Sequence, residues 1–161
     1  MGSTPRLVLS FTVSEQSLAL PLKDVREVLL VPELVPCPGK ILFLEGLMNL
    51  AGTVVPVVRL SRLLSLPDRE VGPYDHVIVL RHNYALLVDC VTGLIYLDQV
   101  ELMPVPPEVT FNECVTNCFK TSGSVISLLS ESQLMLREER LRLKEVQDRH
   151  QSRLAAVGEG D

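Results

Sequence analysis

The sequence constrains its own fold through an internal repeat, in which two stretches of the chain show the same order of patterns. Residues 18–25, LALPLKDV, parallel residues 84–91, YALLVDCV. Further along, residues 52–55, GTVV, parallel residues 123–126, GSVI. Similar segments that recur in a fixed order are typical of a duplicated structural unit. The two halves of the chain are therefore expected to share one architecture.

Each half runs strand, short turn, strand, long loop, strand, glycine turn, strand and helix. The alternation of apolar residues over Leu7–Val13 and the β-branched run Thr53–Val58 are typical of strands. Pro56, within the second run, indicates a sheet edge or a bulge. Closure of short strands into barrels removes free sheet edges. The sequence therefore predicts a mainly β fold of two five-stranded SH3-like β-barrel subdomains, with short helices and a C-terminal α-helix.

A polar segment with two prolines, residues 67–73, is the best candidate for an internal boundary. We expect a single domain over residues 1–161, with a first barrel at 6–66 and a second barrel at 74–136.

The C-terminal segment has the pattern of a long helix. Ser130-Glu131-Ser132-Gln133 has the form of a capping box, in which side chains satisfy the free N–H groups of a first helical turn. We expect a helix over 131–156. Its apolar stripe of Leu136, Leu143 and Val146 is predicted to pack on the second barrel.

Charge and hydropathy restrict the possible partners. The 161-residue chain has a formal net charge of −5. Nucleic-acid binding needs clustered Lys and Arg, so no nucleic-acid partner is expected. The longest apolar stretches, 41–60 and 77–91, are interrupted by Gly, Asn, Pro, Arg or Asp. We therefore expect no direct membrane insertion and a cytoplasmic location.

Residues that could bind metal or catalyse a reaction are scattered along the chain: Cys37, Cys90, Cys114, Cys118, His76, His82 and His150. No CxxC pair and no motif of a hydrolase, a zinc protease or a dinucleotide-binding protein occurs. The sequence therefore predicts no metal, no cofactor and no catalytic residue. The alternative from another class is a small β-barrel thiol enzyme. It would need Cys114 or Cys118 as an exposed nucleophile of low pKa beside a base.

Residues 46–60, GLMNLAGTVVPVVRL, form the most specific motif of the chain. Gly52 permits a tight turn or a positive φ between two apolar strands, and Asn49 can bond backbone groups of the same turn. Gly46, Gly52 and Pro56 are expected to be structural residues of this turn.

This motif, with its Asn-Leu-x-Gly to Pro spacing, resembles the signature of the CheW family of bacterial chemotaxis adaptors. Residues 25–28 and 88–91 resemble two further family segments, and the likeness covers about residues 6–136. The resemblance implies a non-enzymatic adaptor. It would couple the cytoplasmic tip of a methyl-accepting chemoreceptor to the regulatory domain of a CheA-type histidine kinase.

The resemblance also implies receptor contacts in a groove between the barrels, at Val25, Glu27, Asn49, Ala51 and Val88. Two positions depart from the family pattern. Ala51 stands where the family usually has Arg, and the position that usually holds Asp is Arg59. An Arg offers five hydrogen-bond donors and an Ala none. These departures leave open a divergent coupling protein in a receptor or motility pathway other than chemotaxis.

Overall fold

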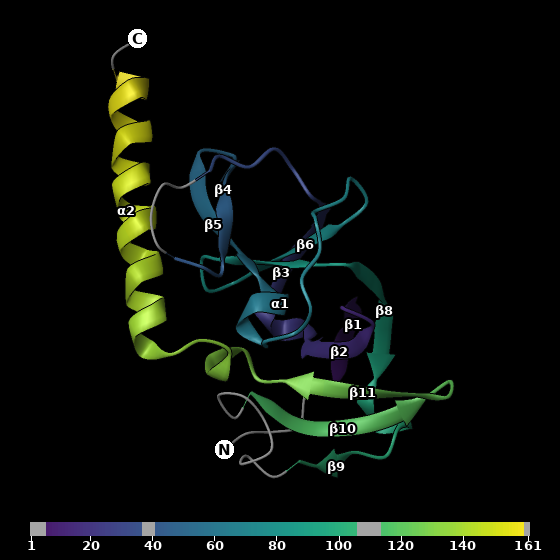
Figure 1. Ribbon diagram of the computed structural model, residues 1–161. Helices are drawn as coiled ribbons and strands as arrows, with labels where there is room; N and C mark the ends of the chain where they lie inside the picture. Colours follow the sequence, from purple (N-terminus) through teal and green to yellow (C-terminus); the bar gives the residue numbers. More distant parts are fainter. Residues whose placement is uncertain (1–5, 37–40, 106–113, 160–161) are drawn as a thin grey trace.

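The computed structural model describes residues 6–36, 41–105 and 114–159 (Figure 1). Within these ranges the chain is mainly β, with two mixed sheets, short helical turns and a long C-terminal helix. The predicted mainly β class is therefore confirmed.

The first sheet has six strands in the order β8-β1-β2-β11-β10-β9. Their bounds are β1 Leu7–Val13, β2 Gln16–Pro21, β8 Cys90–Tyr96, β9 Met103–Pro104, β10 Val115–Thr121 and β11 Ser124–Leu129. The two-residue β9 is an additional short strand in the second half of the chain. Its pairing with β10 adds a sixth strand to the expected five.

The second sheet has five strands in the order β3-β6-β7-β5-β4. Their bounds are β3 Val25–Leu30, β4 Leu44–Leu50, β5 Thr53–Arg59, β6 His76–Leu80 and β7 Ala85–Val88. A 3-10 turn at Leu22–Asp24 precedes β3, and the single-turn helix α1, Leu60–Leu63, follows β5. Beyond β3, Val35 forms an isolated bridge with Leu47 of β4, which helps to close this sheet on itself.

The two repeats exchange strands. In sequence order the first repeat supplies β1 to β5, and the second supplies β6, β7, β8, β10 and β11. Two parallel seams join the repeats: β2 to β11, with Leu18 opposite Ser127, and β5 to β7, with Val57 opposite Ala85. Each sheet therefore combines the first two strands of one repeat with the last three of the other. The ranges 6–66 and 74–136 consequently do not coincide with the two sheets, because each sheet takes strands from both ranges.

Branched aliphatic side chains fill three apolar clusters. The largest joins the two sheets and includes Phe11, Leu20, Ile78 and Leu86, each at most 1% exposed. The other two clusters lie on the remaining faces of the sheets. Phe119, for example, is buried in the six-stranded sheet's own cluster. Both faces of most strands are thus buried, as their near-continuous apolar runs require.

The C-terminal helix begins later than predicted. Helix α2 spans Arg137–Glu159, and residues 131–133 form a 3-10 turn instead. The Ser130 hydroxyl pairs with the Ser132 hydroxyl and caps no backbone N–H, so the capping-box prediction is wrong. The Glu139 carboxylate accepts a hydrogen bond from the Leu136 backbone N–H at 2.7 Å, which secures the actual helix start.

Helix α2 packs mainly against β5, a strand that lies in the range predicted for the first barrel, and it also faces residues 82–84 of the second range, so the expected packing on the second barrel alone is wrong. Of the predicted stripe, Leu143 is buried, Val146 is half-buried and Leu136 is 50% exposed. The last turns of α2 extend past the β4–β5 hairpin (Figure 1). None of the described helices is long and apolar enough to cross a membrane.

Candidate protein-binding site

The turn between β4 and β5 is a two-residue hairpin loop. Leu50 pairs with Thr53, and the two residues between them have positive φ angles, 51° at Ala51 and 90° at Gly52. Positive φ at both central residues is the geometry that matches the twist of the flanking strands. Asn49 Oδ1 accepts a hydrogen bond from the Gly52 backbone N–H at 2.8 Å. The predicted roles of Asn49 and Gly52 in this turn are confirmed.

Gly46 is needed for a different reason from the one expected. It lies inside β4, where it is buried, and not in the turn. A Cβ atom added at Gly46 would lie 2.9 Å from the Val35 carbonyl oxygen. The strand therefore needs glycine here so that the segment after β3 can approach β4 and form the Val35–Leu47 bridge.

The first half of β5 is a sheet edge that helix α2 covers. Pairing of β5 with β7 begins only at Val57, which leaves the backbone of Val54 free on that side. Gln151 Oε1 accepts a hydrogen bond from the Val54 N–H at 2.7 Å, and Gln147 Nε2 donates one to the Val54 carbonyl at 2.9 Å. Gln151 Nε2 also donates to the Gly52 carbonyl at 3.0 Å.

The late start of the β5–β7 pairing also explains why a proline is tolerated at position 56 of β5. Backbone groups alternate along a strand, so the nitrogen of Pro56 points to the side of Val54, where β7 does not yet pair. A proline without an N–H is therefore tolerated at this position. The prediction that Pro56 marks a sheet edge is confirmed.

The predicted groove residues differ in how far they are buried. Val25 and Val88 are 6% and 2% exposed and belong to the central apolar cluster. Glu27 is half-buried on β3 opposite Val79. Asn49 and Ala51 are exposed in the β4–β5 turn. Because the Val25 and Val88 side chains are buried, replacing either would test stability before it tested partner binding.

Exposed apolar side chains on β3 and β8, which lie at sheet edges, were missed by the sequence analysis. Leu30 at the end of β3 is 58% exposed, and on β8 Leu94 is 54% and Tyr96 is 48% exposed. His76 connects the two strands: it pairs with Leu30, and its Nδ1 accepts a hydrogen bond from the Val91 N–H at 3.4 Å. The alternation of exposed and half-buried residues along β8 is a period-two signal that could have indicated this surface.

Arg59 is buried at the end of β5, where it has three polar partners. Its guanidinium donates to Glu45 and to Asp68, each at 2.5 Å, and to the Arg69 carbonyl at 2.7 Å. Arg62 adds a second ion pair to Asp68 at 2.9 Å. Partial burial acts to raise the pKa of Asp68, but hydrogen bonds from Arg62, Arg59 and Ser61 outweigh it and lower this pKa to about 2.

Through Asp68 and the Arg69 carbonyl, Arg59 therefore binds the connection between the two repeats to the five-stranded sheet. Further along this connection, Arg69 pairs with Asp75 at 2.5 Å and with Asp89 at 3.2 Å. The segment 67–73, predicted as a boundary from its composition, is thus held near its start by ion pairs of Asp68 and Arg69, and near its end the Gly72 N–H donates a hydrogen bond to Asp75.

A polar cluster surrounds the buried Glu131 at the foot of α2. The Tyr84 hydroxyl donates to Glu131 Oε1 at 2.8 Å, and Arg140 donates to the Glu131 carbonyl oxygen at 2.8 Å. His82 Nε2 lies 3.3 Å from Glu131 Oε2. Burial and the neighbouring Glu131 carboxylate raise the pKa of Tyr84. The cluster fixes the start of α2 to the loop before β7.

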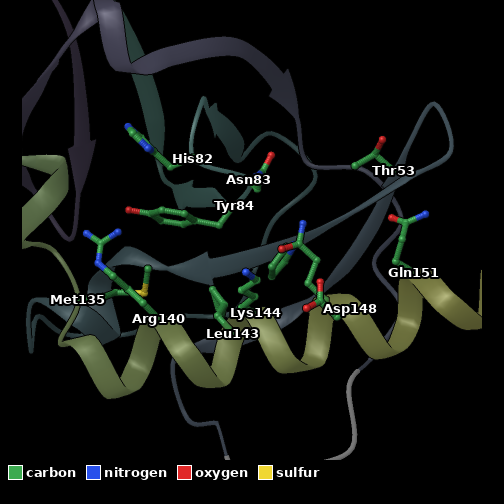
Figure 2. A pocket seen from close by; sticks show the side chains of 12 residues that line it. Thr53, His82, Asn83, Tyr84, Met135, Arg140, Leu143, Lys144, Asp148 and Gln151 are labelled. Carbon is green, nitrogen blue, oxygen red and sulfur yellow. The ribbon is translucent and has the colours of Figure 1, made fainter.

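A cavity of about 420 Å³ lies beside this cluster, between α2 and the loop at residues 82–84. Figure 2 shows Lys144, Asp148 and Gln151 reaching into it from the helix, opposite Asn83. Its charged groups have both signs and lie on one helical face. It therefore presents no converging acid, base and nucleophile.

Cys114 does not meet the requirement for an exposed nucleophile of low pKa. Cys114 is 1% exposed, and burial raises the pKa of its thiol, which keeps it protonated and unreactive. Cys118 is half-buried on β10, and Cys37 lies outside the described residues. Among the described residues, no group of three or more His, Cys, Asp or Glu side chains could hold a metal ion.

The protein is a β-sheet module of the SH3-like kind, built from two sheets that exchange strands. Its exposed apolar residues on β3 and β8 and its β4–β5 hairpin form surfaces that can bind other proteins. The model of the CheW-like domain matches residues 7–139. The chain therefore belongs to the CheW-like domain family.

Individual relatives agree with this assignment. The chemotaxis protein CheW of Thermotoga maritima is 30% identical over 125 residues, which cover 76% of this chain and 82% of the relative. The protein FrzA of Myxococcus xanthus is 31% identical over 99 residues, 60% of this chain and 62% of the relative. The scaffolding protein TtCheW of Thermoanaerobacter tengcongensis shares the fold. Its crystal structure gives a TM-score of 0.69 at 24% identity and covers 79% of this chain and 90% of that one.

Proposed function

We propose that this protein is a cytoplasmic adaptor without catalytic activity of its own. It binds the cytoplasmic tip of a methyl-accepting chemoreceptor and the regulatory domain of a CheA-type histidine kinase. The match of the CheW-like domain to residues 7–139 carries the proposal, and a relative named as a chemotaxis protein supports it. The buried, protonated Cys114 argues against the alternative of a thiol enzyme.

The receptor tip docks along β3 and β8. Leu30, Leu94 and Tyr96 present apolar area there, and β8 is an edge strand of its sheet. A helical receptor segment buries such side chains in a groove with a polar rim. Glu27 lies on β3 and supplies part of that rim. Of the residues that the resemblance implied, Val25 and Val88 belong to the central apolar cluster, against which Val28 of β3 and Val91 of β8 pack.

A second candidate function differs in the pathway that the adaptor serves. Ala51 is exposed in the hairpin turn but offers no side-chain donor, so a contact that depends on an Arg at this position is lost. This absence favours, as a second candidate, a coupling role for the same fold in a receptor pathway other than chemotaxis.

The experiment is a titration of the purified protein with the receptor tip and, separately, with the kinase regulatory domain, both from the same genome. Leu94→Asp places a carboxylate in the receptor contact and should weaken receptor binding at least about tenfold. Val125→Asp is the matched control, because Val125 is 53% exposed on β11 and Leu94 is 54% exposed on β8. Equal receptor affinity of the two variants would remove β8 from the site. Failure of the wild type to bind either partner would refute the adaptor function.

A further inference from the structure

Helix α2 gives this protein a surface that the family match does not include. The match ends at residue 139, whereas α2 continues to Glu159. Gln147 and Gln151 lie one turn apart on the same helical face and bind the edge of β5. His150 and Leu154 continue this face toward the C-terminus, so the two glutamines also fix where these side chains lie.

Beyond the contact of Gln151 with Gly52, a hollow of about 390 Å³ lies between α2 and the β4–β5 hairpin. Its walls are mainly apolar: Val35, Leu47, Met48, Val54 and Leu154. Val35 is 59% exposed, so the hollow opens broadly to solvent. A small molecule is normally held in a pocket that buries most of its surface. This open shape suits a segment of another protein instead.

Two polar groups of the hollow have no partner among the described residues. The Nδ1 atom of His150 is buried and has no hydrogen-bond partner. Arg153 is exposed and, among the residues that the structure describes, forms no ion pair. Asn49 is the third polar side chain of the lining, which contains no carboxylate. Because the exposed Arg153 guanidinium has no acidic group in this lining, an occupant that brings a carboxylate fits the site.

We infer that this hollow docks a segment of a partner protein that presents an apolar side chain next to a carboxylate. The apolar walls receive the side chain, and the Arg153 guanidinium pairs with the carboxylate. The inference rests on the proposed adaptor function. It adds a docking face, on β4 and α2, that uses neither β3 nor β8.

Arg153→Glu tests the inference, because it places a negative charge where the partner's carboxylate would lie. Arg142→Glu is the matched control: it makes the same charge change on the same helix, about 16 Å away along the axis, outside the hollow. Both residues are exposed, so neither change disturbs the core. Val35→Glu repeats the test from the opposite wall of the hollow.

The readout is the dissociation constant for the receptor tip and for the kinase regulatory domain, measured separately by calorimetry. We expect Arg153→Glu and Val35→Glu to weaken binding of one of the two partners by roughly tenfold or more, with Arg142→Glu close to wild type. Unchanged affinity of both hollow variants for both partners would overturn the docking site and leave the adaptor function standing. If the wild type bound neither partner, the adaptor function and the docking site would fall together.

Discussion

Replacing Gln151 with alanine should release the edge of β5 from helix α2. The Gln151 side chain makes two hydrogen bonds, at 2.7 Å from the Val54 N–H and at 3.0 Å to the Gly52 carbonyl. A typical intramolecular hydrogen bond contributes about 1 kcal/mol net, and a buried donor left unsatisfied costs about 1–3 kcal/mol. Val54 is only 6% exposed, so its N–H gains no direct contact with water while the helix stays docked. We therefore expect the docking of α2 to weaken by about 2 kcal/mol.

The assay is native-state hydrogen exchange at the Val54 amide, followed by NMR. A loss of about 2 kcal/mol in local opening free energy corresponds to roughly 30-fold faster exchange. Gln147→Ala is the control, because Gln147 bonds the Val54 carbonyl and leaves the acceptor of the amide in place. It should accelerate the same amide by only about fivefold. Unchanged exchange in Gln151→Ala would refute the conclusion that the helix closes this edge.

Three further predictions concern stability. Arg59→Asp, which restores the usual family residue, should cost about 3 kcal/mol in urea unfolding, because it sets a third carboxylate beside Glu45 and Asp68; wild-type stability would contradict this. Ala51→Asn should raise the melting temperature by about 2 °C, since Asn tolerates positive φ before Gly52 better than Ala does; a lower melting temperature would count against the turn assignment. The pKa of Asp68 is lowered to about 2 in the folded protein. The ionised Asp68 side chain therefore adds to the free energy of unfolding above pH 3.8, and this added stability is lost as the pH falls toward 2. Because a third of the Asp68 side chain is exposed, the free energy of unfolding should fall by about 1 kcal/mol over this pH range. Urea unfolding of Asp68→Asn should not show this part of the pH dependence.

Local patterns predicted most of the strands because each strand carries its own signal. The alternation of Leu7–Val13 gave β1 with the observed bounds, and the repeat correctly paired the glycine turns at Gly52 and Gly123. The pairing of sheets could not be predicted in this way. A repeat describes similarity between halves, whereas the parallel seams β2–β11 and β5–β7 depend on packing between them.

The candidate site was predicted less well than the fold. Asn49 and Gly52 form the expected turn because a short polar side chain and a glycine act within a few residues of sequence. Val25 and Val88 were expected at a binding surface, but a valine has the same pattern whether a partner or the core covers it. The roles of Gln147 and Gln151 depend on a helix that crosses to a strand nearly a hundred residues earlier, and no local pattern signals that contact.

Because the two repeats exchange strands, the connection at residues 67–73 has the role of a linker that keeps one repeat close to the other. A single repeat on its own could not bury its apolar faces, because each sheet draws on both repeats. Two separate copies of such a unit would have to meet as a symmetric pair, and their assembly would depend on concentration. Joining them through one short connection makes the encounter intramolecular, with an effective concentration on the order of millimolar. Assembly of the two halves is thereby independent of how much of the protein a cell contains.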